Sequence, residues 1–149
     1  MKRTILAAVA FSALMMTGAY AADHEVKMLN KGAKGSMVFE PDFITAQVGD
    51  TVTFLPTDPG HLAETTPKML PPGGKEFKGK AGKPITMTID AEGVYGVKCL
   101  PHFSMGMVAV VVAGKPVNLE EAKAAAAKIP SPKAKAKYVE LLGQVPATN

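Results

Sequence analysis

Short stretches of alternating or continuous apolar residues, separated by turn residues, fill the chain from residue 22 to residue 113. Stretches of this kind predict β-strands, and we place them at residues 25–29, 36–40, 43–48, 51–55, 85–89, 94–99 and 108–112. The last stretch is apolar at every position, which predicts a strand buried on both faces. Strands this short and this closely spaced indicate an all-β sandwich.

The hydrophobic pattern becomes helical after residue 117. Asn118 is a candidate helix cap with Glu121 three positions later, and an alanine-rich run follows. Ser131-Pro132 predicts a second helix with proline in its first position, and Gly143 is expected to end that helix. We therefore predict two C-terminal α-helices within residues 117–143, packed against a sandwich formed by residues 22–113.

The first 21 residues have a different composition. Met1-Lys2-Arg3 is basic, an apolar run extends from Ile5 to Met16, and Ala19-Tyr20-Ala21 has the small-x-small pattern of a cleavage site. Together these features predict a secretory signal peptide, residues 1–21, cleaved after Ala21. The alternative is a membrane anchor, but the run is too short to span a bilayer. One exported domain, residues 22–149, would remain, with no membrane attachment.

The charge of this domain excludes one class of partner. The whole chain has 17 basic and 13 acidic residues, and removal of Lys2 and Arg3 leaves 15 against 13, a net charge of +2. Nucleic-acid-binding domains carry a strong basic patch, often interleaved with aromatic residues, and none is visible here. We therefore expect no nucleic-acid partner.

Potential metal ligands are concentrated in residues 98–107. This stretch holds the only cysteine, Cys99, together with His102 and two of the nine methionines. Thiolate, imidazole and thioether are ligands that copper accepts, and two histidines with one cysteine and a weak axial methionine form the blue-copper arrangement. His61, in a Gly-His turn, is the candidate for the second histidine. His24, near the start of the domain, is expected to be satisfied or solvated instead.

Other functions could use the same residues. Cys99 with His102 or His61 could form a cysteine-nucleophile enzyme, but Cys-Leu-Pro-His shows no nucleophile elbow or helix start, so no enzyme is predicted. Zinc accepts the same ligands, and a copper chaperone or storage protein would also bind through them. A single buried cysteine can also be inert.

The motif Cys-x₂-His-x₄-Met, with the upstream Gly-His turn, resembles the cupredoxins. Residues 28–32, 37–41, 49–54 and 99–107 together resemble the pseudoazurins among them, and the helical tail favours this group over plastocyanin. The resemblance implies a Greek-key β-sandwich, the cupredoxin fold, of about eight strands with two C-terminal α-helices. It also implies one type 1 copper ion whose ligands are His61, Cys99, His102 and Met107.

Two details of the implied site need a choice. Met105 follows His102 at the spacing of amicyanin and Met107 at the spacing of pseudoazurin, and the flanking residues favour Met107 as the axial ligand. Pseudoazurins usually have asparagine after the upstream histidine, where this chain has Leu62. Since leucine cannot make the side-chain hydrogen bonds of asparagine, the site is expected to form with an altered potential or stability.

The resemblance further implies a monomeric, periplasmic electron carrier. A c-type cytochrome would donate electrons, and a copper nitrite reductase, nitrous oxide reductase or cytochrome cd1 would accept them in denitrification. The alternative is a plastocyanin-like or amicyanin-like carrier in another pathway. Partners would dock at an apolar patch near His102 that is rimmed by lysines, with Lys31, Met37, Lys78, Lys98, Pro101 and Met105 as its expected members.

Overall fold

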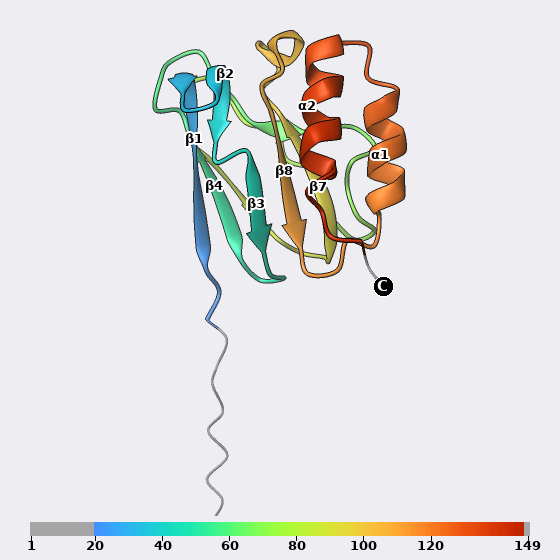
Figure 1. Cartoon of the computed structure of the whole chain (residues 1–149). Helices are drawn as coiled ribbons and strands as arrows, with labels where there is room; N and C mark the ends of the chain where they lie inside the picture. The colour runs from blue at the N-terminus through green and yellow to red at the C-terminus, as the bar shows by residue number, and fades with distance from the viewer. Residues whose placement is uncertain (1–19, 148–149) are drawn as a thin grey trace, which may run out of the picture.

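The computed structural model describes residues 20–147, so most of the predicted signal peptide lies outside the described part of the chain. Eight strands form two four-stranded sheets (Figure 1). The first sheet has the order β2 (Gly35–Glu40), β1 (Asp23–Gly32), β4 (Thr51–Leu55), β6 (Ile85–Thr88). The second has the order β3 (Phe43–Ala46), β8 (Val108–Ala113), β7 (Gly93–Lys98), β5 (Glu64–Thr65).

Both sheets are mixed. Strand β1 runs parallel to β4, and β3 runs parallel to β8, whereas the other neighbouring strands are antiparallel. Alternate residues of β4 enter the core, as its sequence pattern predicts, and Val52 and Phe54 are fully buried. The rings of Phe39 and Phe54 meet edge to face with centroids 5.6 Å apart. The predicted all-β sandwich is therefore confirmed.

Strand β8 is buried on both faces, as its continuous apolar sequence predicts. Ala109, Val111 and Ala113 belong to the core between the sheets. The intervening residues Val108, Val110 and Val112 pack instead against the helical layer. Two helices form that layer, α1 (Leu119–Ala127) and α2 (Pro132–Leu142), which cover the outer face of the second sheet (Figure 1).

The N-termini of the two helices are formed differently. Ser131 accepts a hydrogen bond from the amide of Ala134, so the predicted start of α2 is confirmed. Asn118 is the N-cap residue of α1, as predicted, but its side chain makes no capping hydrogen bond. Its amide instead pairs with both backbone groups of Val94 in β7, at 2.7 and 2.9 Å. Asn118 therefore ties the helical layer to the sheet.

The long connection between β4 and β6 contains the one strand that the sequence pattern did not indicate. Strand β5 has two residues, too few to show a periodicity. It is nevertheless firmly placed, because the amide of Thr66 donates to Gly96 at 2.8 Å and that of Gly79 donates to Ala63 at 2.8 Å. A Cβ on Gly79 would lie 2.7 Å from the Ala63 carbonyl oxygen, so only glycine permits this approach. The connection is ordered along the segment that follows His61.

Within residues 20–147, no helix has the length and apolar character needed to cross a bilayer.

Candidate metal centre

Three of the four predicted ligands meet at one end of the sandwich. His61 lies in the turn after β4, and Cys99 directly follows β7. His102 precedes the short 3₁₀ helix η1 (Phe103–Met105). His61 and Cys99 are fully buried, whereas His102 is partly exposed. His61, in the turn that follows a strand of the first sheet, is thus brought against the loop between β7 and β8 of the second sheet.

The donor atoms form a compact triangle. The Nδ1 atoms of His61 and His102 lie 3.1 Å apart. The Cys99 Sγ atom lies 3.8 Å from Nδ1 of His61 and 3.5 Å from Nδ1 of His102. One ligand atom of each of the three residues lies within 4.8 Å of the other two.

The size of this triangle fits a first-row metal ion. An ion about 2.0 Å from two nitrogens and about 2.3 Å from a sulfur, as found for zinc, keeps donors at trigonal angles about 3.5–3.7 Å apart. The observed separations of 3.1, 3.5 and 3.8 Å lie close to these values. Two imidazoles and one thiolate also match the preference of copper for nitrogen and soft sulfur. The residues present therefore fit copper.

Hydrogen bonding and burial determine the protonation states of His61 and Cys99 before an ion binds. His61 donates from Nε2 to the Asn30 side-chain oxygen at 2.9 Å, which leaves its Nδ1 as the acceptor of a neutral imidazole. Burial and then repulsion from His102 lower the pKa of His61, against an opposing effect of Asp58. Burial raises the pKa of the Cys99 thiol. A metal ion thus meets a neutral His61 and displaces a proton from Cys99.

Two contacts around the ligands bear on the presence of leucine at position 62, where pseudoazurins usually have asparagine. Asn30, on β1, was not predicted as part of the site, yet it orients His61 through Nε2. The backbone of Leu62 hydrogen-bonds to Cys99, and this bond lowers the pKa of the thiol against the larger effect of burial. Leu62 therefore keeps a backbone contact to the sulfur of Cys99, and Asn30, on β1, holds the ring of His61.

Gly60 has a different role from the one that its position suggests. A glycine beside the ligand would be expected to provide room for close backbone approach. A Cβ at Gly60 would meet nothing within 4 Å, so space is not the reason. The residue has φ of +85°, in the left-handed region, and this conformation is what requires glycine in the turn before His61.

Backbone hydrogen bonds close the ligand loop between β7 and β8. The Cys99 amide donates to the Met107 carbonyl at 3.0 Å, and the Met107 amide donates to the His102 carbonyl at 3.3 Å. Met107 is fully buried in the core beside these residues, whereas Met105 is 45% exposed. Of the two candidate axial methionines, Met107 thus lies inside the molecule and Met105 on its surface.

Several apolar side chains close to His102 in the sequence are exposed. Met105, Pro101 and Leu100 are exposed there, and Leu100, which the sequence analysis did not include in the patch, is 50% exposed. Lys31 and Lys78 are exposed as predicted for its basic rim. The loop that carries Cys99 and His102 thus has three exposed apolar side chains.

Lys98 differs from the other two predicted rim lysines. Its Nζ lies 3.3 Å from Oε1 of Glu64, and only 15% of its side chain is exposed. The ammonium group also lies 5.5 Å from the ring centre of Phe103. The Glu64 carboxylate offsets the charge of Lys98, so this lysine presents much less positive potential than a free one.

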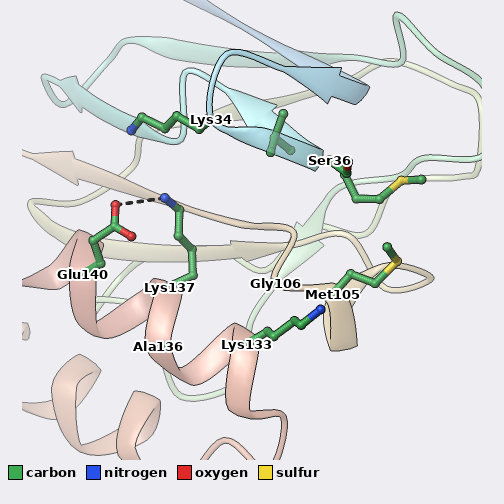
Figure 2. A pocket seen from close by; sticks show the side chains of 10 residues that line it. Lys34, Ser36, Met105, Gly106, Lys133, Ala136, Lys137 and Glu140 are labelled. Carbon is green, nitrogen blue, oxygen red and sulfur yellow. Dashed lines mark hydrogen bonds and ion pairs between the residues drawn. The ribbon is translucent and has the colours of Figure 1, made fainter.

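A second lysine-rich region borders the patch. A groove between β2 and α2 is lined by Lys34, Met105, Lys133 and Lys137 among others (Figure 2). Lys34 and Lys137 both bind the buried carboxylate of Asp42, at 2.6 and 2.9 Å. Burial alone would raise the pKa of Asp42, but these two lysines lower it. The groove is therefore less basic than its composition suggests.

Comparison with known proteins defines the class. Residues 26–114 match the model of the copper-binding proteins of the plastocyanin/azurin family. The chain belongs to this family, the cupredoxins, and its cofactor is copper.

Within the family, the chain belongs to the pseudoazurins. It is 51% identical over 120 residues to the pseudoazurin of Paracoccus pantotrophus, which covers 80% of this chain and 82% of the relative. The crystal structure of pseudoazurin from Methylobacterium extorquens AM1 matches with a TM-score of 0.76 at 42% identity, over 83% of this chain and 99% of that one. The native pseudoazurin of Hyphomicrobium denitrificans gives 0.76 at 38% identity, over 84% and 99%. These relationships support a blue copper electron carrier rather than an enzyme.

Proposed function

We propose that this chain is a periplasmic type 1 copper protein that carries single electrons between redox proteins. Its ligands are the Nδ1 atoms of His61 and His102, the Cys99 thiolate and, as a weak axial ligand, the Met107 thioether. The observation that supports this best is the triangle of two imidazole nitrogens and one sulfur, with sides of 3.1–3.8 Å. When bound, copper supplies the one-electron change between Cu(II) and Cu(I).

The protein contributes rigidity and exclusion of water. His61 and Cys99 are fully buried, and hydrogen bonds to Asn30 and across the ligand loop hold them in place. A held donor set rearranges little when the charge of the ion changes, which favours rapid electron transfer. A copper chaperone or store needs ligands open to exchange, and two fully buried donors out of three argue against that alternative.

Electrons are proposed to leave and enter at His102. This is the partly exposed ligand, and the apolar side chains of Leu100, Pro101 and Met105, close to it in the sequence, are exposed. A small apolar patch with a basic rim suits a weak, fast contact with an acidic partner. By resemblance to the pseudoazurins, the donor is a c-type cytochrome and the acceptor a denitrification reductase: copper nitrite reductase, nitrous oxide reductase or cytochrome cd1.

Titration with Cu(II), followed by visible absorption, tests the metal assignment. We expect an intense blue or green colour that saturates at one copper ion per chain, because a Cu–thiolate bond absorbs strongly. Zinc added first should compete for the site without producing the colour. A weak absorption typical of nitrogen and oxygen ligands alone would contradict the proposal.

Electron-transfer rates at increasing ionic strength test the docking face. The rate with an acidic reductase should fall as salt is added, and Lys78→Gln should weaken that salt dependence. Lys98→Gln should weaken it less, because Glu64 already offsets the charge of Lys98. A rate independent of salt, or a larger effect at Lys98 than at Lys78, would contradict the assigned rim.

A further inference from the structure

A cluster of hydrogen bonds at the start of β1 surrounds one buried carboxylate. Oδ1 of Asp50 accepts from the backbone nitrogen of Ala22 at 2.9 Å. Oδ2 lies 2.9 Å from Nε2 of His24 and 2.9 Å from the amide of Gln47. Asp50 is only 6% exposed, and these donors lower its pKa from 3.8 to about 2. A strongly held carboxylate thus lies directly beside residue 22.

Within residues 20–147, the first strand begins beside this contact. The carbonyl of Ala22 accepts from the amide of Thr51 at 2.9 Å, and β1 starts one residue later. The residue two positions earlier, Tyr20, is 97% exposed. Among the described residues, Ala22 is therefore the first whose two backbone polar groups are both bound by the sandwich.

The bond Ala21–Ala22 is also the cleavage point that the leader pattern predicts. In the uncut chain, the nitrogen of Ala22 is a neutral amide with one hydrogen to donate. After cleavage, the same nitrogen becomes an α-ammonium group with a positive charge and three hydrogens. A charged donor adds the attraction between opposite charges to the hydrogen bond that the neutral amide already makes with the Asp50 carboxylate.

We propose that Asp50 is the receptor for the α-ammonium group of Ala22, so that removal of the leader completes an ion cluster and stabilises the sandwich. The uncut chain retains a weaker hydrogen bond at this position, from a neutral amide to the same carboxylate. The cluster lies at the opposite end of β4 from the turn that carries His61, and it involves none of the copper ligands. The proposal is therefore independent of the function of the metal site.

Thermal unfolding of two chains that start at Ala22 tests the proposal. One has a free α-amino group and the other is Nα-acetylated, which removes the charge and keeps the N–H. All helices and strands of the described residues begin at or after Asp23, so both chains contain the whole fold. With the same copper loading, the free chain should unfold about 2–4 °C higher near neutral pH.

The difference should depend on Asp50 and on pH. It should vanish in Asp50→Asn and persist in Glu25→Gln, which alters an exposed carboxylate on the same strand. The titratable groups around the ammonium are Asp50, His24 and Asp23, the last bound to Thr51 and Thr53. An α-amino group titrates near about pH 8 when unpaired. Pairing raises its pKa, so the advantage is full below that pH and is lost as pH rises through the higher folded value.

Titration of the Ala22 α-amino group by NMR gives a second test, which uses the folded wild-type domain and needs no substituted variant. The proposal predicts a pKa above the ordinary range of about 7.7–8.0. An ordinary value, equal unfolding temperatures for the free and acetylated chains, or a difference that persists in Asp50→Asn would each overturn it. The mass of the exported protein should correspond to a first residue at Ala22, and another start would also overturn it.

Discussion

The two ends of the sandwich each gather polar side chains around a histidine, but the two clusters use their histidines differently. At the Asp50 end, three nitrogens converge on a carboxylate, and donors meet an acceptor. At the opposite end, two imidazole nitrogens and a sulfur converge on one another at 3.1–3.8 Å. All three atoms are potential metal ligands, so a positive ion is the partner that would join them.

The difference separates a structural histidine from a ligand histidine. Nε2 of His24 finds its partner within the protein, at Asp50. His61 also uses Nε2 within the protein, on Asn30, and keeps Nδ1 for the common point. A hydrogen bond from Nε2 to a side-chain oxygen does not distinguish the two residues, because both make one. The second ring nitrogen, directed at other electron-pair donors, does.

Removal of the Cys99 sulfur should have the largest effect, and it should affect only the metal-binding end of the sandwich. Cys99→Ser should abolish the intense Cu(II) absorption entirely, because the Cu–thiolate bond is lost. The change is nearly isosteric, so the fold should persist by circular dichroism. His24→Gln, at the other end, is the matched control and should leave the absorption unchanged. Retention of the colour in Cys99→Ser would show that the sulfur is not a ligand.

Loss of the residue that holds His61 should have the next largest effect. Asn30→Ala removes the acceptor of Nε2, and loss of such a supporting partner costs typically about 10–100-fold in metal affinity. Competition with a copper chelator would measure this change. Thr53→Ala, which removes hydrogen bonds on β4 far from the ligands, should lower the unfolding temperature without weakening copper binding. Equal copper affinities in wild type and Asn30→Ala would contradict the role of Asn30.

Acid should lower the stability of the protein by protonating the carboxylate of Asp50. The pKa of Asp50 is lowered from 3.8 to about 2, so its contribution to stability is fully present above 3.8 and is lost as pH falls through about 2. In metal-free protein, the difference in unfolding temperature between wild type and Asp50→Asn should therefore shrink over that range. A difference that stays constant down to pH 2 would contradict the hydrogen-bonded carboxylate.

The smallest expected effect is at Leu62. The backbone of Leu62 already contacts the sulfur, so Leu62→Asn should add only side-chain hydrogen bonds to a site that forms without them. We expect a shift in midpoint potential of up to about 60 mV, the one-electron equivalent of a tenfold change in equilibrium constant, or a small rise in unfolding temperature. No change in either quantity would show that the side chain here does not tune the site.

Much of the site could be predicted because its donors are close in sequence. Cys99, His102 and Met107 lie within one short loop between two strongly apolar strands, so the fold has little freedom to separate them. His61 required the motif, since a single histidine has no periodicity to mark it. The sandwich and the second helix followed from apolar spacing and from the Ser131-Pro132 pair.

The parts that could not be predicted depend on pairing between distant segments. Asn30 reaches His61 because β1 lies parallel to β4, and no local pattern reveals that register. Lys98 appeared to be a free surface lysine because β5, which brings Glu64 beside it, has only two residues. Asn118 had the sequence of a helix cap, but the backbone of Val94 in β7 offered its amide two partners at once.

X-ray absorption spectroscopy at the copper edge of the loaded protein tests the central claim most directly. If the donor atoms of His61, Cys99 and His102 surround one ion, the spectrum must show a single short sulfur neighbour and two nitrogen neighbours per copper. A first shell made only of nitrogen and oxygen, or one with no imidazole nitrogen, would contradict the account.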